Sequence, residues 1–65
     1  MSAIGDYILA IKRMADEELI EYLIELTEDR AVLIYMNEQT EMIKTCIKHL
    51  DDSIETVKTE LLRRM

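Results

Sequence analysis

Cys46 and His49 are the two residues of the 65-residue sequence that come nearest to a reactive or metal-binding pair. On a helix their spacing places a thiol and an imidazole one turn apart, and Asp52 follows one turn later. Such a ladder supplies two or three ligands to a metal ion, so a closed tetrahedral site would need a second chain. No glycine-rich loop or candidate oxyanion hole accompanies the pair. We interpret Cys46 as a boundary cysteine and His49 as a surface histidine, and we expect no enzymatic activity, no metal and no cofactor.

Residues 16–29 form an acidic segment that holds seven acidic side chains and no basic one. Four of them are spaced by three and four residues and would form one line on a helix, here called the acidic ridge: Glu18, Glu21, Glu25 and Glu28. Like charges at this spacing destabilise an isolated helix by roughly 0.2–0.5 kcal/mol per pair. The ridge is therefore either a solvated face or a docking surface for a basic partner. The formal net charge of −6 disfavours direct binding to nucleic acid or to an anionic membrane.

An uncharged run at residues 31–36 has high β-propensity and would be an aggregation hazard if it were exposed. We interpret it as the centre of the core, with a dimer contact or a docking site as the alternative. Tyr35 lies in this run, and its hydroxyl can anchor a partner at the edge of a core. We therefore add Tyr35 to the acidic ridge as a candidate partner-binding residue.

All the elements that carry these residues are predicted to be helices. The chain has no proline and a single glycine, so the many tight turns of a sandwich or barrel are excluded. Apolar residues spaced by three and four predict a first helix over about residues 3–14: Ile4, Tyr7, Ile8, Ile11 and Met14. Asp16 is the expected N-cap of a second helix that extends to about residue 36.

The chain after residue 26 allows two interpretations. Apolar residues continue in one heptad phase from Leu19 to Leu61, which is compatible with a single long helix. The polar tetrads 27–30 and 37–40 are instead candidate turns of a helical hairpin. We favour a break near Asn37, which could cap a third helix over about residues 38–64, because globular helices typically run about 8–20 residues.

The C-terminal half narrows to a coiled-coil seam, and the small size of the chain predicts an oligomer. Below about 70–80 residues one core seldom contributes more than about 3–5 kcal/mol, and one cysteine cannot form an intramolecular disulfide. We expect a single all-α domain over residues 1–65, assembled as a dimeric helical bundle. The expected interface residues are Leu33, Met36, Ile43, Ile47, Leu50, Ile54, Val57 and Leu61.

Two short stretches resemble known families of small helical proteins. The pattern Ile4-x-x-Tyr7-x-x-x-Ile11-x-x-Met14-Ala15-Asp16-Glu17-Glu18-Leu19, followed by Leu23-Ile24-Glu25-Leu26, resembles the NblA family. That resemblance covers about a third of the chain and implies a dimeric helical adaptor, of the kind that marks phycobilisomes for degradation. The shorter stretch Asp16-Glu17-Glu18-Leu19-Ile20-Glu21 is similar to the start of Sda, a helical-hairpin inhibitor of sporulation kinases. Both resemblances imply a protein that acts by binding another protein.

These observations predict a small acidic helical regulator of bacterial or phage type, an adaptor or inhibitor that binds another protein. The start of the chain has no basic and apolar leader pattern, so we expect a cytoplasmic protein. Two alternatives stay open at this point. One is a structural oligomerisation or assembly-chaperone coiled coil, and the other is an acidic, phosphate-mimicking inhibitor of a DNA-binding protein.

Overall fold

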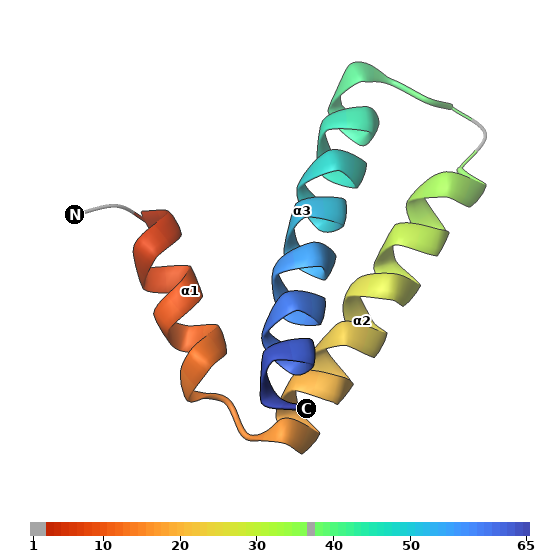
Figure 1. Ribbon diagram of the computed structural model, residues 1–65. Coiled ribbons are helices and arrows are strands. Elements are labelled where there is room, and N and C mark those ends of the chain that lie inside the picture. The colour runs from red at the N-terminus through yellow and green to blue at the C-terminus, as the bar shows by residue number, and fades with distance from the viewer. Residues whose placement is uncertain (1–2, 37) are drawn as a thin grey trace.

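The computed structural model describes residues 3–36 and 38–65, with the side chains of residues 5–36 and 38–65. It contains three helices, α1 (Ala3–Arg13), α2 (Asp16–Tyr35) and α3 (Glu41–Arg64). The two long helices α2 and α3 pack as an antiparallel hairpin, and α1 lies beside the C-terminal half of α3 (Figure 1). The all-α prediction is thus confirmed, and the chain forms a hairpin rather than one continuous helix.

The start of α2 differs from the expectation by one residue. Ala15 occupies the N-cap position with extended backbone, and Asp16 is the first helical residue. The Ala15 N–H donates to the Glu18 carboxylate at 3.2 Å, so the cap interaction comes from Glu18. Asp16, Glu17 and Glu18 all lie in the first turn, where negative charge suits the positive end of the helix dipole. The predicted N-cap at Asp16 is therefore wrong, because its backbone is already helical and its carboxylate accepts a hydrogen bond from Arg64.

The hairpin turn uses the second of the two polar tetrads. The Gln39 side-chain amide donates to the carbonyl oxygens of Leu33 and Met36, at 3.2 and 3.0 Å, which satisfies acceptors at the C-terminal end of α2. The Thr40 hydroxyl accepts a hydrogen bond from the Ile43 N–H at 3.3 Å and is the N-cap of α3. Helix α3 therefore begins at Glu41, later than the predicted residue 38. The cap that we expected at Asn37 lies outside the described residues.

The first tetrad, residues 27–30, continues α2 without interruption. The Thr27 hydroxyl donates to the Leu23 carbonyl at 2.8 Å, so this polar side chain is satisfied within the helix. Arg30 forms an ion pair with Asp51 of α3 and thereby joins the two helices of the hairpin. Polar residues at this point therefore tie α2 to its neighbour instead of ending it.

The core lies at the end of the hairpin where all three helices meet. Its buried apolar residues are Ile11, Leu19, Leu26, Ile54 and Val57. The expectation that residues 31–36 form the centre of the core is wrong. The side chains of Val32, Ile34 and Tyr35 are 60%, 47% and 86% exposed. The reason is that α3 covers only one side of α2 at this end, the side that carries the half-buried Leu33.

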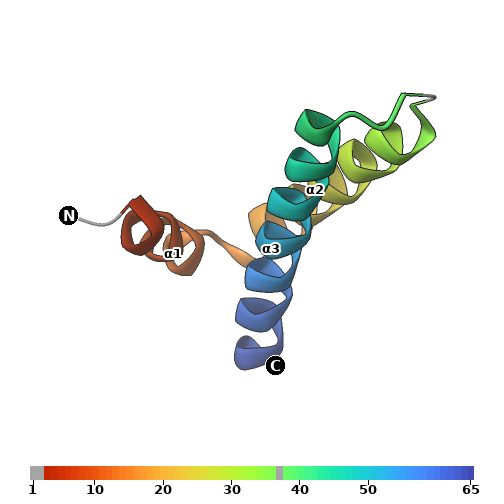
Figure 2. The same cartoon turned by 90° about the horizontal axis from the view of Figure 1, so that it is seen from above.

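The molecule is thin and open for its length. Its principal extents are 37 × 28 × 14 Å, and the smallest is close to the thickness of one helix. The Cα radius of gyration is 13.1 Å, above the value of about 11 Å expected for a compact chain of this length. Seen from above, α1 lies to one side and diverges from the hairpin towards its N-terminal end (Figure 2). In the described parts of the chain, no helix is both long and apolar enough to cross a membrane.

Candidate protein-interaction surface

Helix α2 presents three faces, of which one is covered by the rest of the chain. The covered face carries Leu19 and Leu26, which are buried against α3 and α1, with Leu23 packed beside them. On one side of this face lies the acidic ridge, and on the other side lies a line of isoleucines. Both uncovered faces extend along most of the length of α2.

The acidic ridge lies on the surface of α2 as the sequence predicted. Glu18, Glu21, Glu25 and Glu28 are all exposed. Within residues 3–36 and 38–65, the last three of these carboxylates form no ion pair, whereas Glu18 accepts the hydrogen bond from Ala15. The ridge is therefore a line of carboxylates that the chain itself does not neutralise.

The spacing of the ridge continues beyond its last acid into exposed apolar residues. Val32 follows Glu28 by four residues and Tyr35 follows Val32 by three, so both lie in line with the acids. Both are exposed, Tyr35 more than any other aromatic residue. The surface thus changes along one helix from negative charge to apolar side chains.

A groove between α2 and α3 adjoins this apolar end of the ridge. Its volume is about 480 Å³, and it is lined by Asp29, Val32, Leu33, Cys46, His49 and Leu50. The structure thus brings Cys46 and His49 to the groove wall and leaves Cys46 as an exposed free thiol. Among the residues that the structure describes, no group of three or more His, Cys, Asp or Glu side chains is arranged to hold a metal ion. The pair therefore contributes to the shape of a groove next to the ridge.

Most of the expected interface residues pack within one chain. Ile54 and Val57 are buried, and Leu50 and Leu61 pack against the same core. Leu33, Ile43 and Ile47 are half-buried between α2 and α3, and Met36 is exposed at the end of α2. We assigned this coiled-coil seam to contacts with a second chain, but α2 and α3 of the same chain pack against each other along it. No partner chain is present, so dimerisation itself stays a prediction.

Arg64 is an organising residue that sequence reasoning missed. Its guanidinium donates to the carbonyl oxygens of Met14 and Lys12 at 2.7 and 3.0 Å, and so satisfies acceptors at the C-terminal end of α1. It also donates to the carboxylates of Asp16, at 2.8 Å, and Glu60, at 2.7 Å. One side chain thus connects the ends of all three helices. Its position in the heptad pattern is the signal in the sequence, because Arg64 follows Leu61 by three residues in a phase that is mostly apolar.

Glu60 is the buried carboxylate at the centre of this arrangement. Its side chain is 5% exposed, and it receives two hydrogen bonds from Arg63, at 3.0 and 2.7 Å, besides the one from Arg64. The hydrogen bonds from Arg63 and then Arg64 lower the pKa of Glu60 to about 2, against the smaller opposing effect of burial. The pairs between Glu60 and the two arginines thus hold a buried charge.

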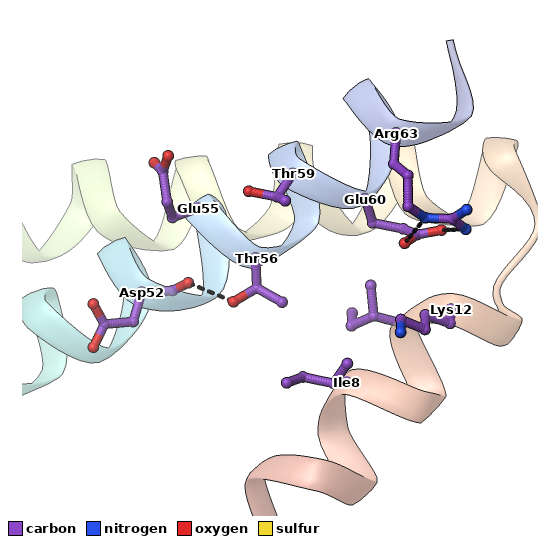
Figure 3. A pocket seen from close by; sticks show the side chains of 9 residues that line it. Ile8, Lys12, Asp52, Glu55, Thr56, Thr59, Glu60 and Arg63 are labelled. Carbon is purple, nitrogen blue, oxygen red and sulfur yellow. Dashed lines mark hydrogen bonds and ion pairs between the residues drawn. The ribbon is translucent and has the colours of Figure 1, made fainter.

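A second groove separates α1 from α3 and shows how lightly α1 is attached. It has a volume of about 490 Å³, with Ile8 and Lys12 on one side and Thr56, Thr59 and the Glu60–Arg63 pair on the other (Figure 3). Beside it, the Tyr7 and Tyr22 hydroxyls form a hydrogen bond of 2.8 Å between α1 and α2. Burial, and then this hydrogen bond, raise the pKa of Tyr22 to about 12. Helix α1 is thus held at one end by a few polar contacts and the core residue Ile11.

No family model, no curated protein and no solved structure matches this chain. The stretches that resemble NblA and Sda therefore stay similarities of local sequence around the start of α2, and the interpretation of function depends on the surfaces described above.

Proposed function

We propose that this protein is a non-enzymatic regulator that binds another protein through α2. The proposed binding surface consists of the acidic ridge, its apolar continuation at Val32 and Tyr35, and the adjoining α2–α3 groove. The observation that carries the proposal is the alignment of unpaired carboxylates and exposed apolar side chains on one helix face. The partner that fits this face is an amphipathic helix with basic residues at one end and apolar residues at the other.

The distribution of the acids favours binding over simple solvation. Within the described residues, four of the ten acids outside the ridge have cationic partners, namely Asp16, Glu41, Asp51 and Glu60. The ridge acids have none within the described residues, although each adjacent pair on the helix repels. Like-charged residues in a line create a local field that attracts a basic partner and speeds association.

The apolar end of the face favours a partner protein over a small ion. A solvated face would carry polar residues along its whole length, but this one ends in Val32, Tyr35 and an apolar groove. Aromatic and aliphatic side chains of this kind act as anchors in the centre of protein interfaces, while surrounding charges set the orientation of the partner. The ridge would then select and orient the partner, and the groove would hold it.

An affinity capture from the native host with three baits tests the proposal. The wild-type bait should retain a partner, and the double variant Glu21→Lys/Glu25→Lys should lose it. A control variant, Asp52→Lys/Glu55→Lys, changes the charge by the same amount at two exposed acids one turn apart on α3, and it should retain the partner. Circular dichroism should show the same helix content for all three baits. Equal retention by the ridge variant and the control would refute the ridge assignment.

The predicted dimer and the cytoplasmic location belong to the same proposal. The alternative of an assembly module that acts through its coiled-coil seam has less support, because α2 of the same chain packs on that seam. The alternative of a phosphate mimic would make the captured partner a DNA-binding protein, with binding that DNA displaces. A partner that DNA does not displace would contradict that alternative.

A further inference from the structure

The third face of α2 is apolar and uncovered. This face is here called the apolar stripe. It consists of five residues at alternating spacings of four and three: Ile20, Ile24, Thr27, Ala31 and Ile34. The isoleucine side chains are 49%, 51% and 47% exposed, in contrast to the buried Leu19 and Leu26 of the adjacent face. Three half-exposed isoleucines in line on one helix are a patch that soluble monomers rarely leave uncovered.

The apolar stripe faces away from α1 and from the proposed partner-binding face. Asp29 and Val32 line the α2–α3 groove on one side of the covered face, and Tyr22 contacts α1 on that same side. The stripe residues fall on the opposite side of the covered face, because each comes one residue after Leu19, Leu23, Leu26, Arg30 or Leu33. Tyr22, Asp29 and Val32 instead each come one residue before one of these positions. Figure 2 shows α1 on one side only of the hairpin. No helix of the described chain therefore covers the stripe.

The stripe can be removed from water without leaving a polar group unpaired. It contains no ionisable side chain. Its one polar residue is Thr27, whose hydroxyl already donates to the Leu23 carbonyl at 2.8 Å. Burial of this face would therefore add apolar contacts with no unsatisfied donor of its own.

The single-layer architecture of the chain explains why such a face needs a cover. Stable domains consist of at least two packed layers around a core, whereas this chain is 14 Å thick and has five buried apolar residues among those described. A second layer that covers the stripe would place apolar residues on both sides of α2. It would supply the burial that a chain of this size lacks by itself.

The size of the face matches a second copy of the chain. Helix α2 has 20 residues, so it is about 30 Å long and about 10 Å wide. The adjoining flank of α3, on the side opposite Cys46 and His49, carries exposed charges of both signs at Lys44, Asp51, Glu55 and Lys58 and ends in the exposed Leu62. Together α2 and this flank present on the order of 600 Å², and the smallest specific interfaces bury about 600 Å² per partner.

We propose that a second copy of this chain packs on the apolar stripe, so that two hairpins form a four-helix bundle with two-fold symmetry. Each helix of such a bundle contacts its two neighbouring helices through two adjacent faces. The two apolar faces of α2, the covered face and the apolar stripe, are adjacent in this way. This interface differs from the coiled-coil seam, which lies inside each hairpin. It also leaves the acidic ridge and the α2–α3 groove free for a partner.

Two lysine variants on the same helix test the interface by size-exclusion chromatography with light scattering. The wild type should be a dimer, and Ile24→Lys should raise its dissociation constant by about a hundredfold, because each interface would then bury two unpaired charges. Val32→Lys is the matched control, since Val32 is exposed on the opposite flank of α2, and it should remain dimeric. A monomeric wild type, or a dimer that only Val32→Lys disrupts, would overturn the proposal.

A spin-label experiment covers the case in which Ile24→Lys fails to fold. A nitroxide is attached to Thr27→Cys or to Val32→Cys, each in a Cys46→Ser background, and its mobility is followed as the protein concentration rises. The label at 27 should become immobilised and the label at 32 should not. Immobilisation at 32 alone would assign the interface to the groove side, and no change at either position would exclude a second copy on α2.

Discussion

The two ends of the α2–α3 hairpin differ in what holds them together. At the end where α1 joins, here called the closed end, Leu19 and Val57 have no exposed surface and Arg64 connects three helix termini. At the end that carries the turn, here called the open end, the seam residues Leu33 and Ile43 are only half-buried. The described contacts there include the Arg30–Asp51 ion pair and the cap from Gln39. Apolar packing and polar contacts thus concentrate at one end.

This contrast separates the part of the molecule that maintains the fold from the part that is available for binding. Local stability follows apolar burial, and elements with few buried contacts open first. Val32 and Tyr35 of the open end are exposed and belong to the proposed partner-binding surface. A partner at this end would gain contacts that the chain does not make for itself.

The largest expected effect is the loss of a core side chain at the closed end. Leu19→Ala should lower the free energy of unfolding by about 3 kcal/mol, because it removes a fully buried leucine. Ile43→Ala at the open end should lower it by about 1 kcal/mol, because that side chain is only half-buried. Urea unfolding at one protein concentration measures both values. Equal losses would contradict the difference between the two ends.

The second expected effect is a difference in Tm between variants of the two arginines that bind Glu60. Arg64→Met should lower the Tm clearly, because it removes the hydrogen bonds to the Met14 and Lys12 carbonyls and to Asp16. Arg63→Met should lower it less, because the Arg63 side chain is 64% exposed and, within the described residues, hydrogen-bonds to Glu60 alone. Thermal unfolding by circular dichroism, with helix content checked at low temperature, compares them. The reverse order would show that Arg64 does not organise the closed end.

The third expected effect is a loss of stability in acid that depends on Glu60. Its pKa is about 2 in the folded protein and about 4.5 as an ordinary glutamate, so folding favours the ionised form. The contribution is complete above pH 4.5 and should be lost as the pH falls towards 2. Glu60→Gln should be less stable than the wild type at pH 7, and the difference should shrink over this range. An equal difference at pH 7 and at pH 2.5 would contradict the role of the buried carboxylate.

The smallest expected effect concerns the attachment of α1. Tyr22→Phe should lower the free energy of unfolding by about 1 kcal/mol through loss of the hydrogen bond with Tyr7. The pKa of Tyr22 is raised to about 12 from 10.0, so its contribution is complete below pH 10 and is lost between pH 10 and 12. Tyr35→Phe is the control, since Tyr35 is exposed. Equal alkaline sensitivity of the two variants would contradict the assignment.

Periodicity predicted helices along the chain, but its unbroken heptad phase left the hairpin and one long helix open as alternatives. The three-and-four spacing identified α1 and α2, and the polar residues at 37–40 identified the turn, where Gln39 and Thr40 prove to be the capping residues. The N-cap at Asp16 was wrong because the Asp16 carboxylate binds Arg64 while Glu18 binds the Ala15 N–H. Cap positions depend on a single side-chain hydrogen bond, which a helical pattern does not determine.

The helical pattern of the sequence did not determine which helices contact one another. A heptad seam predicts that an apolar line is covered, but the partner can be another helix of the same chain or of a second chain. The seam was assigned to a second chain, whereas Ile54 and Val57 pack within one chain. The acidic ridge was predicted correctly as an exposed line because charge and spacing alone determine it. The role of Arg64 was missed because three of its acceptors, on Met14, Lys12 and Asp16, come from residues about fifty positions away in the sequence.

Residue-resolved amide hydrogen exchange on the free protein tests the contrast between the two ends most directly. Amides in residues 19–26 of α2 and 54–61 of α3 should exchange most slowly, and those in residues 33–36 and 43–47 should exchange through much more frequent local opening. Low protein concentration keeps the contribution of any second copy small. Equal protection along both helices, or slower exchange at the open end, would contradict the account that one end maintains the fold and the other is available to a partner.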